Sequence, residues 1–246
     1  MSMNTTAVPP PLPLSPPWGF WMTLVWGVVA FVTGAVVAFP AGYAILGGRL
    51  TGGMDDGVQL SVIMGVSLTV QTSVVLLAAR WRRWPVADYL GLVAPRGRRD
   101  LLVALICLVV VGVALSLFAI AAGRDMVSPF QIKTYTSAKA EGWLAALIFV
   151  IVVVAPVGEE ILFRGFLYRG WAKPGYEIYA IIGITILFAA GHIQYDWVGI
   201  TQVAVIGLVF GWFRWATGST LLTIVMHILV NLESVIETVI KVEFLS

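Results

Sequence analysis

The sequence has few charged residues and almost no cysteine. Charged residues make up 11% of its 246 residues, whereas hydrophobic residues make up 59%. A soluble domain carries roughly a quarter of its residues as charges. This chain therefore lacks the polar side chains needed to cover a water-facing surface. The composition excludes a soluble enzyme, a nucleic-acid-binding protein and a disordered tail as interpretations of the whole chain, and it is typical of a polytopic membrane protein.

The single cysteine and the small net charge exclude further classes. Cys107 lies in an apolar run and has no second cysteine to pair with, so a disulfide framework and a cysteine-based metal cluster are both excluded. A net charge of +2 is too small to indicate an anionic polymer as a partner. We therefore expect the chain to lie in a lipid bilayer and to have no nucleic acid as a partner.

The long apolar stretches predict the fold class. A helix needs about 20 apolar residues to cross the hydrocarbon core of a bilayer. Seven candidate stretches lie near residues 20–47, 58–79, 101–122, 143–167, 178–195, 198–216 and 219–240. We expect an all-α bundle of about seven (six to eight) transmembrane helices that enclose a polar cavity.

Composition also divides the chain. Residues 1–17 contain six of the twelve prolines and no charge, which predicts a disordered tail. No Lys or Arg precedes Arg49, so the first apolar stretch lacks the basic start of a cleavable signal. We expect residues 18–142 to hold the first transmembrane helices and a basic loop, and residues 143–246 to hold the catalytic helices.

The basic residues predict the orientation. Six of the fifteen lie between Arg80 and Asp100, namely Arg80, Arg82, Arg83, Arg96, Arg98 and Arg99. Cytoplasmic loops carry an excess of Lys and Arg, so this loop and the amino terminus are expected in the cytoplasm. The compact chain without a carboxy-terminal retention signal leads us to expect the inner membrane of a bacterial cell.

Polar residues within the predicted spans are the candidate site. An ionisable group at the bilayer centre costs at least ~2.5–3.5 kcal/mol, so its presence indicates a function. The candidates are concentrated in the second half of the chain: Glu159, Glu160, Arg164, His192, His227 and Asn231. His192 and His227 are the two histidines of the protein.

Helical geometry gives these residues different roles. Glu160 and Arg164 are four residues apart and can form an ion pair, whereas Glu159 points about 100° away and is left free. His227 and Asn231 share a helix face. Glu233 and Glu237 share another face, so we do not expect them to join the site.

Depth in the membrane supports a single site. With a rise of ~1.5 Å per residue, Glu159 lies ~16 Å from its cytoplasmic helix end and His192 ~21 Å. On the same scale His227 lies ~12 Å and Asn231 ~18 Å from theirs. Three helices thus bring polar groups to one layer, and we expect cleavage near the cytoplasmic face.

These groups suit the hydrolysis of a peptide bond. Burial raises the pKa of a carboxyl group toward neutrality, as a general base for water requires. Imidazole and amide groups can hold the water and stabilise the oxyanion that forms. Zinc held by Glu159, His192 and His227 is the alternative, because two His and one Glu are a known ligand set. The His-Glu-x-x-His spacing of soluble metalloproteases is absent.

Three motifs resemble those of the CAAX-protease and bacteriocin-processing family, also called the Abi family. They are Glu159-Glu160-x-x-x-Arg164, Phe188-x-x-x-His192 and His227-x-x-x-Asn231. The family consists of intramembrane endopeptidases, some of which trim prenylated proteins. The resemblance implies that Glu159 activates water together with His192 and that His227 and Asn231 form the oxyanion hole. It further implies that Glu160 and Arg164 support the site. Of the two mechanisms described for the family, we favour the glutamate type, which needs no cofactor.

Two other functions account for the same residues. A non-catalytic scaffold or immunity protein could bind a peptide in this cavity, and its phenotype would survive Glu159→Gln. A proton- or ion-coupled carrier could use the buried Glu and His residues as a relay, although the chain has no internal repeat to support a transporter. The peptidase hypothesis takes as its partner a peptide or membrane-protein substrate, with or without a prenyl group.

Overall fold

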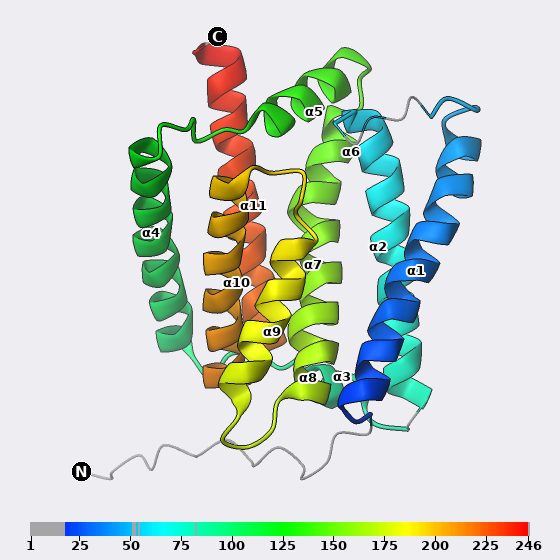
Figure 1. Cartoon of the computed structure of the whole chain (residues 1–246), viewed down its shortest axis with the longest axis vertical. Coiled ribbons are helices and arrows are strands. Elements are labelled where there is room, and N and C mark those ends of the chain that lie inside the picture. Colours follow the sequence, from blue (N-terminus) through cyan, green and yellow to red (C-terminus); the bar gives the residue numbers. More distant parts are fainter. Residues whose placement is uncertain (1–17, 51–52, 54, 82, 246) are drawn as a thin grey trace.

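The computed structural model describes residues 18–50, 53, 55–81 and 83–245, which form helices and no strand (Figure 1). Six helices are long and apolar enough to cross a membrane: α1 (Phe20–Ile45), α2 (Gly57–Trp81), α4 (Arg98–Ala121), the continuous helix Leu144–Trp171, α10 (Trp197–Thr217) and α11 (Thr220–Phe244). The predicted all-α, multi-pass helix bundle is confirmed. The expected disordered tail, residues 1–17, lies outside the described residues.

The fifth predicted span is shorter than expected. Helix α9 covers Glu177–Ala190 and ends at Gly191, so the turn that follows contains His192. Asp196 then caps α10 by accepting a hydrogen bond of 3.0 Å from the Gly199 N–H. The predicted span, residues 178–195, ran past Gly191 into this turn, although the turn holds the polar residues His192 and Gln194.

Two short helices lie at opposite ends of the bundle (Figure 1). Helix α3 (Val86–Leu90) lies beside the last turn of the Leu144–Trp171 helix, and α5 (Pro129–Ala140) crosses the other end. A capping box between Ser128 and Gln131 begins α5. We call these the α3 end and the α5 end.

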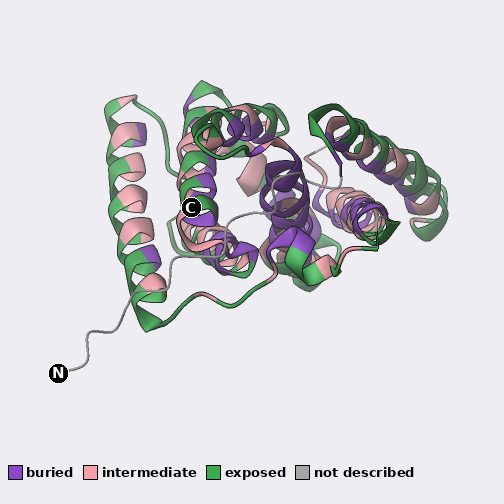
Figure 2. Ribbon diagram, turned by 90° about the horizontal axis from the view of Figure 1, so that it is seen from below, coloured by how far each residue is buried: buried purple, intermediate pink, exposed green. Residues whose placement is uncertain are grey.

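The central helix is built from five segments: α6 (Leu144–Phe149), η1 (Val150–Val154), α7 (Ala155–Glu160), η2 (Ile161–Leu167) and α8 (Tyr168–Trp171). The segments η1 and η2 are π-helical, a distortion that is frequent at functional sites. Buried residues are concentrated in this helix (Figure 2). It therefore forms the centre of the bundle.

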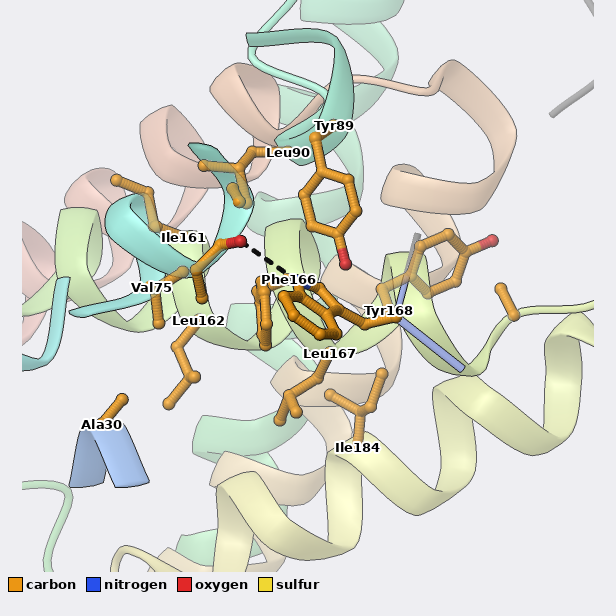
Figure 3. Close-up of a cluster of buried hydrophobic side chains, with 14 of the residues drawn as sticks. Ala30, Val75, Tyr89, Leu90, Ile161, Leu162, Phe166, Leu167, Tyr168 and Ile184 are labelled. Carbon is orange, nitrogen blue, oxygen red and sulfur yellow. Dashed lines mark hydrogen bonds between the residues drawn. The ribbon is translucent and has the colours of Figure 1, made fainter. Parts of the chain in front are cut away.

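The largest apolar core surrounds the lower part of this helix, toward the α3 end. Phe166 is fully buried and packs beside Tyr89 and Leu90 of α3 (Figure 3). The Thr220 hydroxyl donates a hydrogen bond of 2.6 Å to the Leu90 carbonyl, which ties α11 to α3. Tight packing at the α3 end leaves the polar site above this core. Helix α4, in contrast, lies at the edge of the bundle.

Candidate active site

Glu160 is the centre of a buried polar network. Its carboxylate is fully buried, and its Oε1 atom accepts a hydrogen bond of 2.9 Å from Arg164 Nη1. The same Oε1 lies 3.0 Å from Nδ1 of His227 on α11. The ion pair with Arg164 agrees with the geometry predicted from their spacing, whereas the contact with His227 was not predicted. Glu160 thus pairs with Arg164 within the central helix and joins this helix to α11 through its contact with His227.

Arg164 is held on all sides although it carries a charge. Its Nη2 donates a hydrogen bond of 3.0 Å to the carbonyl of Gly207 on α10. Its guanidinium carbon lies 4.4 Å from the ring centroid of Phe188 and 5.4 Å from that of Phe210. The arginine therefore fixes α9 and α10 against the Glu160 carboxylate.

Glu159 differs from its neighbour, as the helical geometry predicts. Its Oε2 atom is buried and has no hydrogen-bond partner within the described part of the chain. That atom lies 4.0 Å from Nε2 of His227, close enough for one water molecule to contact both groups. Glu159 is therefore the carboxylate that is available for chemistry.

Both histidine rings contact Phe188. The Phe188 centroid lies 4.9 Å from that of His192 and 5.9 Å from that of His227. Nδ1 of His192 lies 2.8 Å from the Phe188 carbonyl. A carbonyl oxygen only accepts, so we assign the proton to this Nδ1 and leave Nε2 of His192 free. Phe188 thus aligns the two imidazoles.

Asn231 contacts the distorted part of the central helix. In η1 the Ala155 N–H bonds to the carbonyl of Val150, five residues earlier. The next bond in this pattern would run from residue 156 to Ile151, but Pro156 has no N–H. The Asn231 amide instead donates a hydrogen bond of 2.7 Å to the Ile151 carbonyl. One N–H of the amide is thus used structurally, and the other is left for a ligand.

A cavity of about 810 Å³ is lined by Phe188, His192, His227 and Asn231, and Glu159 lies behind His227, outside the set of lining residues. Glu233 and Glu237 line the same cavity, so the expectation that they lie apart from the site was wrong. Helix α4 packs so close to α11 that a Cβ atom at Gly112 would lie 3.6 Å from the Glu233 carboxylate. Helix periodicity could not show this, because α4 closes the cavity on that side.

The rim of the cavity lies at the α5 end, where Arg124, Asp125 and Asp196 are exposed. This differs from the expectation of a site near the face of the basic loop, since that loop lies at the α3 end (Figure 1). The depths calculated from the sequence place the polar groups in one layer, but they do not show from which end that layer is reached.

The motifs did not include Tyr195, which belongs to the site. Its ring lies 6.2 Å from that of His192 at an angle of 11° and lines the cavity. Burial and, to a lesser extent, the Glu159 carboxylate raise the pKa of Tyr195 to about 12, so its hydroxyl stays protonated at neutral pH. Tyr195 follows His192 by three residues in the turn between α9 and α10. This spacing is the sequence signal that would have indicated Tyr195 as a site residue.

The zinc alternative does not fit the arrangement of side chains. Among the residues that the structure describes, no three His, Cys, Asp or Glu side chains are gathered as metal ligands. We therefore derive no catalytic step through a metal ion.

Comparison with known proteins agrees with this geometry. Residues 141–232 match the family model described as Type II CAAX prenyl endopeptidase Rce1-like. No curated protein and no solved structure matches the chain. The matched segment contains all three motifs, from Glu159 to Asn231. It therefore confirms the resemblance to the CAAX-protease family, and residues 141–232 of this multi-pass membrane protein are of the type found in CAAX-type intramembrane proteases.

Proposed function

We propose that the protein is an intramembrane endopeptidase that hydrolyses a peptide bond with a water molecule activated by Glu159. One observation carries this proposal: among the described residues no Arg or Lys pairs with Glu159 and its buried Oε2 atom accepts no hydrogen bond, whereas the neighbouring Glu160 is paired with Arg164. A carboxylate that no cation holds can accept a proton from water as a general base. The match to CAAX-type proteases supports the same reaction.

The proposed reaction begins with the water. Glu159 takes a proton from it, with His192 holding the water, while the oxygen adds to the carbonyl carbon of the peptide bond. The resulting oxyanion accepts hydrogen bonds from His227 and from the second N–H of Asn231. When the C–N bond breaks, Glu159 returns its proton to the leaving amine. Two peptides with a new carboxyl and a new amino terminus are released.

Glu160 and Arg164 support this reaction through His227. With Nδ1–H donating to Glu160, His227 can donate from Nε2 only when the imidazole is protonated. The Glu160 carboxylate holds the imidazole in place by accepting the hydrogen bond from Nδ1. Arg164 in turn keeps Glu160 ionised and in place. The two residues are thus positioning residues that never touch the substrate.

Comparing peptide termini in whole cells tests the proposal without a known substrate. Cells would carry the wild type, Glu159→Gln or the control Glu141→Gln, at matched abundance in the membrane. Glu141 is an exposed carboxylate outside the cavity. We expect a set of termini that vanishes with Glu159→Gln and persists with Glu141→Gln. Identical termini in all three strains would contradict a peptidase and support the peptide-binding scaffold or the ion-coupled carrier.

A further inference from the structure

Two buried arginines near the α3 end have no carboxylate partner. Arg169 is 7% exposed and Arg214 is 4% exposed, and within the described part of the chain no ion pair joins either of them to an acidic side chain. Arg164, which is also buried, is paired with Glu160. A buried charge is costly unless an opposite charge and hydrogen bonds compensate it. Arg169 and Arg214 are therefore buried charges that the described side chains leave without a counterion.

Arg169 makes no hydrogen bond to any other described residue. Its Nε atom is enclosed and has no partner, whereas its two terminal nitrogens are not enclosed in this way. Its guanidinium carbon lies 5.5 Å from the ring centroid of Trp84. A cation–π contact of this kind offsets part of the cost of desolvating a guanidinium group, but it uses none of the N–H donors. These donors are therefore available to a ligand.

The neighbouring side chains do not supply the missing negative charge. Arg214 lies close enough to Arg169 for their like charges to repel each other. Its Nε donates a hydrogen bond of 2.9 Å to the Arg164 carbonyl, and its guanidinium carbon lies 5.0 Å from the ring centroid of Tyr168. Burial raises the pKa of Tyr89, which lies near Arg169, to about 12, so this hydroxyl stays neutral. A single anion between the two guanidinium groups would compensate both charges.

The two arginines lie at the depth of lipid head groups. The last turns of α8 and α10 both lie at the α3 end (Figure 1). Arg169 precedes Trp171 at the end of the central helix, and Arg214 precedes Trp215 near the end of α10. Tryptophans are enriched at the membrane–water interface, at the level of the head groups. Basic sites between transmembrane helices bind anionic head groups at this level.

We propose that Arg169 and Arg214 form a binding site for one phosphate anion at the α3 end. The phosphate of an anionic phospholipid and inorganic phosphate share the required chemistry, because both present oxygen atoms to the fork of guanidinium N–H groups. The bound anion joins the central helix to α10 and stabilises the folded protein. Neither arginine lines the cavity at the candidate active site, so the proposal does not depend on the peptidase function.

Thermal unfolding of the purified, delipidated protein tests the site. Wild type, Arg169→Met and the control Arg98→Met would be titrated in a neutral detergent with phosphatidylglycerol, phosphatidylcholine or sodium phosphate, at an ionic strength held constant with chloride. Arg98 is an exposed cation at the same end, so its replacement removes the same charge. Phosphatidylglycerol should raise the Tm of wild type and of Arg98→Met at the same concentration. Arg169→Met should need at least about tenfold more of it, because charge-assisted hydrogen bonds are lost.

The response to sodium phosphate distinguishes the two sources of the anion. Stabilisation by sodium phosphate that Arg169→Met loses would identify free phosphate as a ligand, and stabilisation by phosphatidylglycerol alone would identify the lipid. Equal responses of Arg169→Met and wild type to both anions would overturn the proposal, as would no stabilisation beyond that given by phosphatidylcholine and chloride.

The stability of Arg169→Met without an anion separates the binding site from a structural role. Arg169 has no hydrogen bond to lose, so without an anion Arg169→Met should unfold at the same temperature as the wild type or a higher one. A markedly lower Tm under these conditions would show that Arg169 stabilises the fold by its own contacts, and it would also overturn the proposal.

Discussion

The Asn231 side chain donates a hydrogen bond of 2.7 Å to the carbonyl of Ile151, the carbonyl that Pro156 leaves without a partner in the π-helical segment. A backbone carbonyl without a partner is costly within a bilayer. The proline and the asparagine are therefore energetically linked, although they lie on different helices. The same link places the Asn231 amide beside the cavity.

Asn231→Ala should destabilise the protein by about 1–3 kcal/mol, because it leaves the Ile151 carbonyl unsatisfied. In a Pro156→Ala background the restored N–H can bond to that carbonyl, so Asn231→Ala should cost less. Thermal unfolding of the four proteins in detergent gives this double-mutant cycle. Equal losses in both backgrounds would show that Asn231 and Pro156 are independent.

The same variants test Asn231 as an oxyanion donor. We expect Asn231→Ala to lower the turnover rate by about 10²–10³-fold, the usual effect of removing one such donor. The loss should persist in the Pro156→Ala background, since Pro156→Ala restores a backbone hydrogen bond and no donor to the oxyanion. If turnover recovered in the Pro156→Ala background, Asn231 would be a positioning residue and not an oxyanion donor.

Removing one member of the buried ion pair should be severe. Arg164→Met leaves the Glu160 carboxylate uncompensated in a fully buried site, and we expect a loss of about 3–5 kcal/mol in the free energy of unfolding. The double variant Arg164→Met/Glu160→Gln carries neither charge of this pair and should be more stable than Arg164→Met alone. A double variant that is less stable than either single variant would contradict this account of the pair.

Metal removal tests the zinc alternative directly. Purified protein treated with 1,10-phenanthroline should keep its turnover of a substrate identified from the cellular termini, and elemental analysis should find less than one zinc per chain. Loss of turnover that added Zn²⁺ restores would contradict the glutamate-type mechanism. Glu159, His192 and His227 would then have to move together to form the ligand set.

The sequence predicted what depends on local geometry. Glu160 and Arg164 lie in one helix, so their spacing alone predicted both their contact and the freedom of Glu159. Apolar length likewise predicted the long helices, because crossing a bilayer requires it. Depth in the membrane placed the polar groups of separate helices in one layer.

Relationships between distant helices could not be predicted in this way. The contact of His227 with Glu160 joins residues 67 positions apart and depends on how α11 packs against α7. The end of α9 at Ala190 was not predicted, because the span was extended through His192 and Gln194 to the next tryptophan-rich boundary.

The central claim is that Glu159 is the general base, and turnover by purified protein tests it most directly. Wild type, Glu159→Gln and the surface control Glu141→Gln would be compared on one cellular substrate, with matched thermal stability. General-base catalysis contributes about 10²–10⁴-fold, so Glu159→Gln should lose at least about 100-fold in rate. Glu141→Gln should match the wild type. Wild-type turnover by Glu159→Gln would contradict the mechanism.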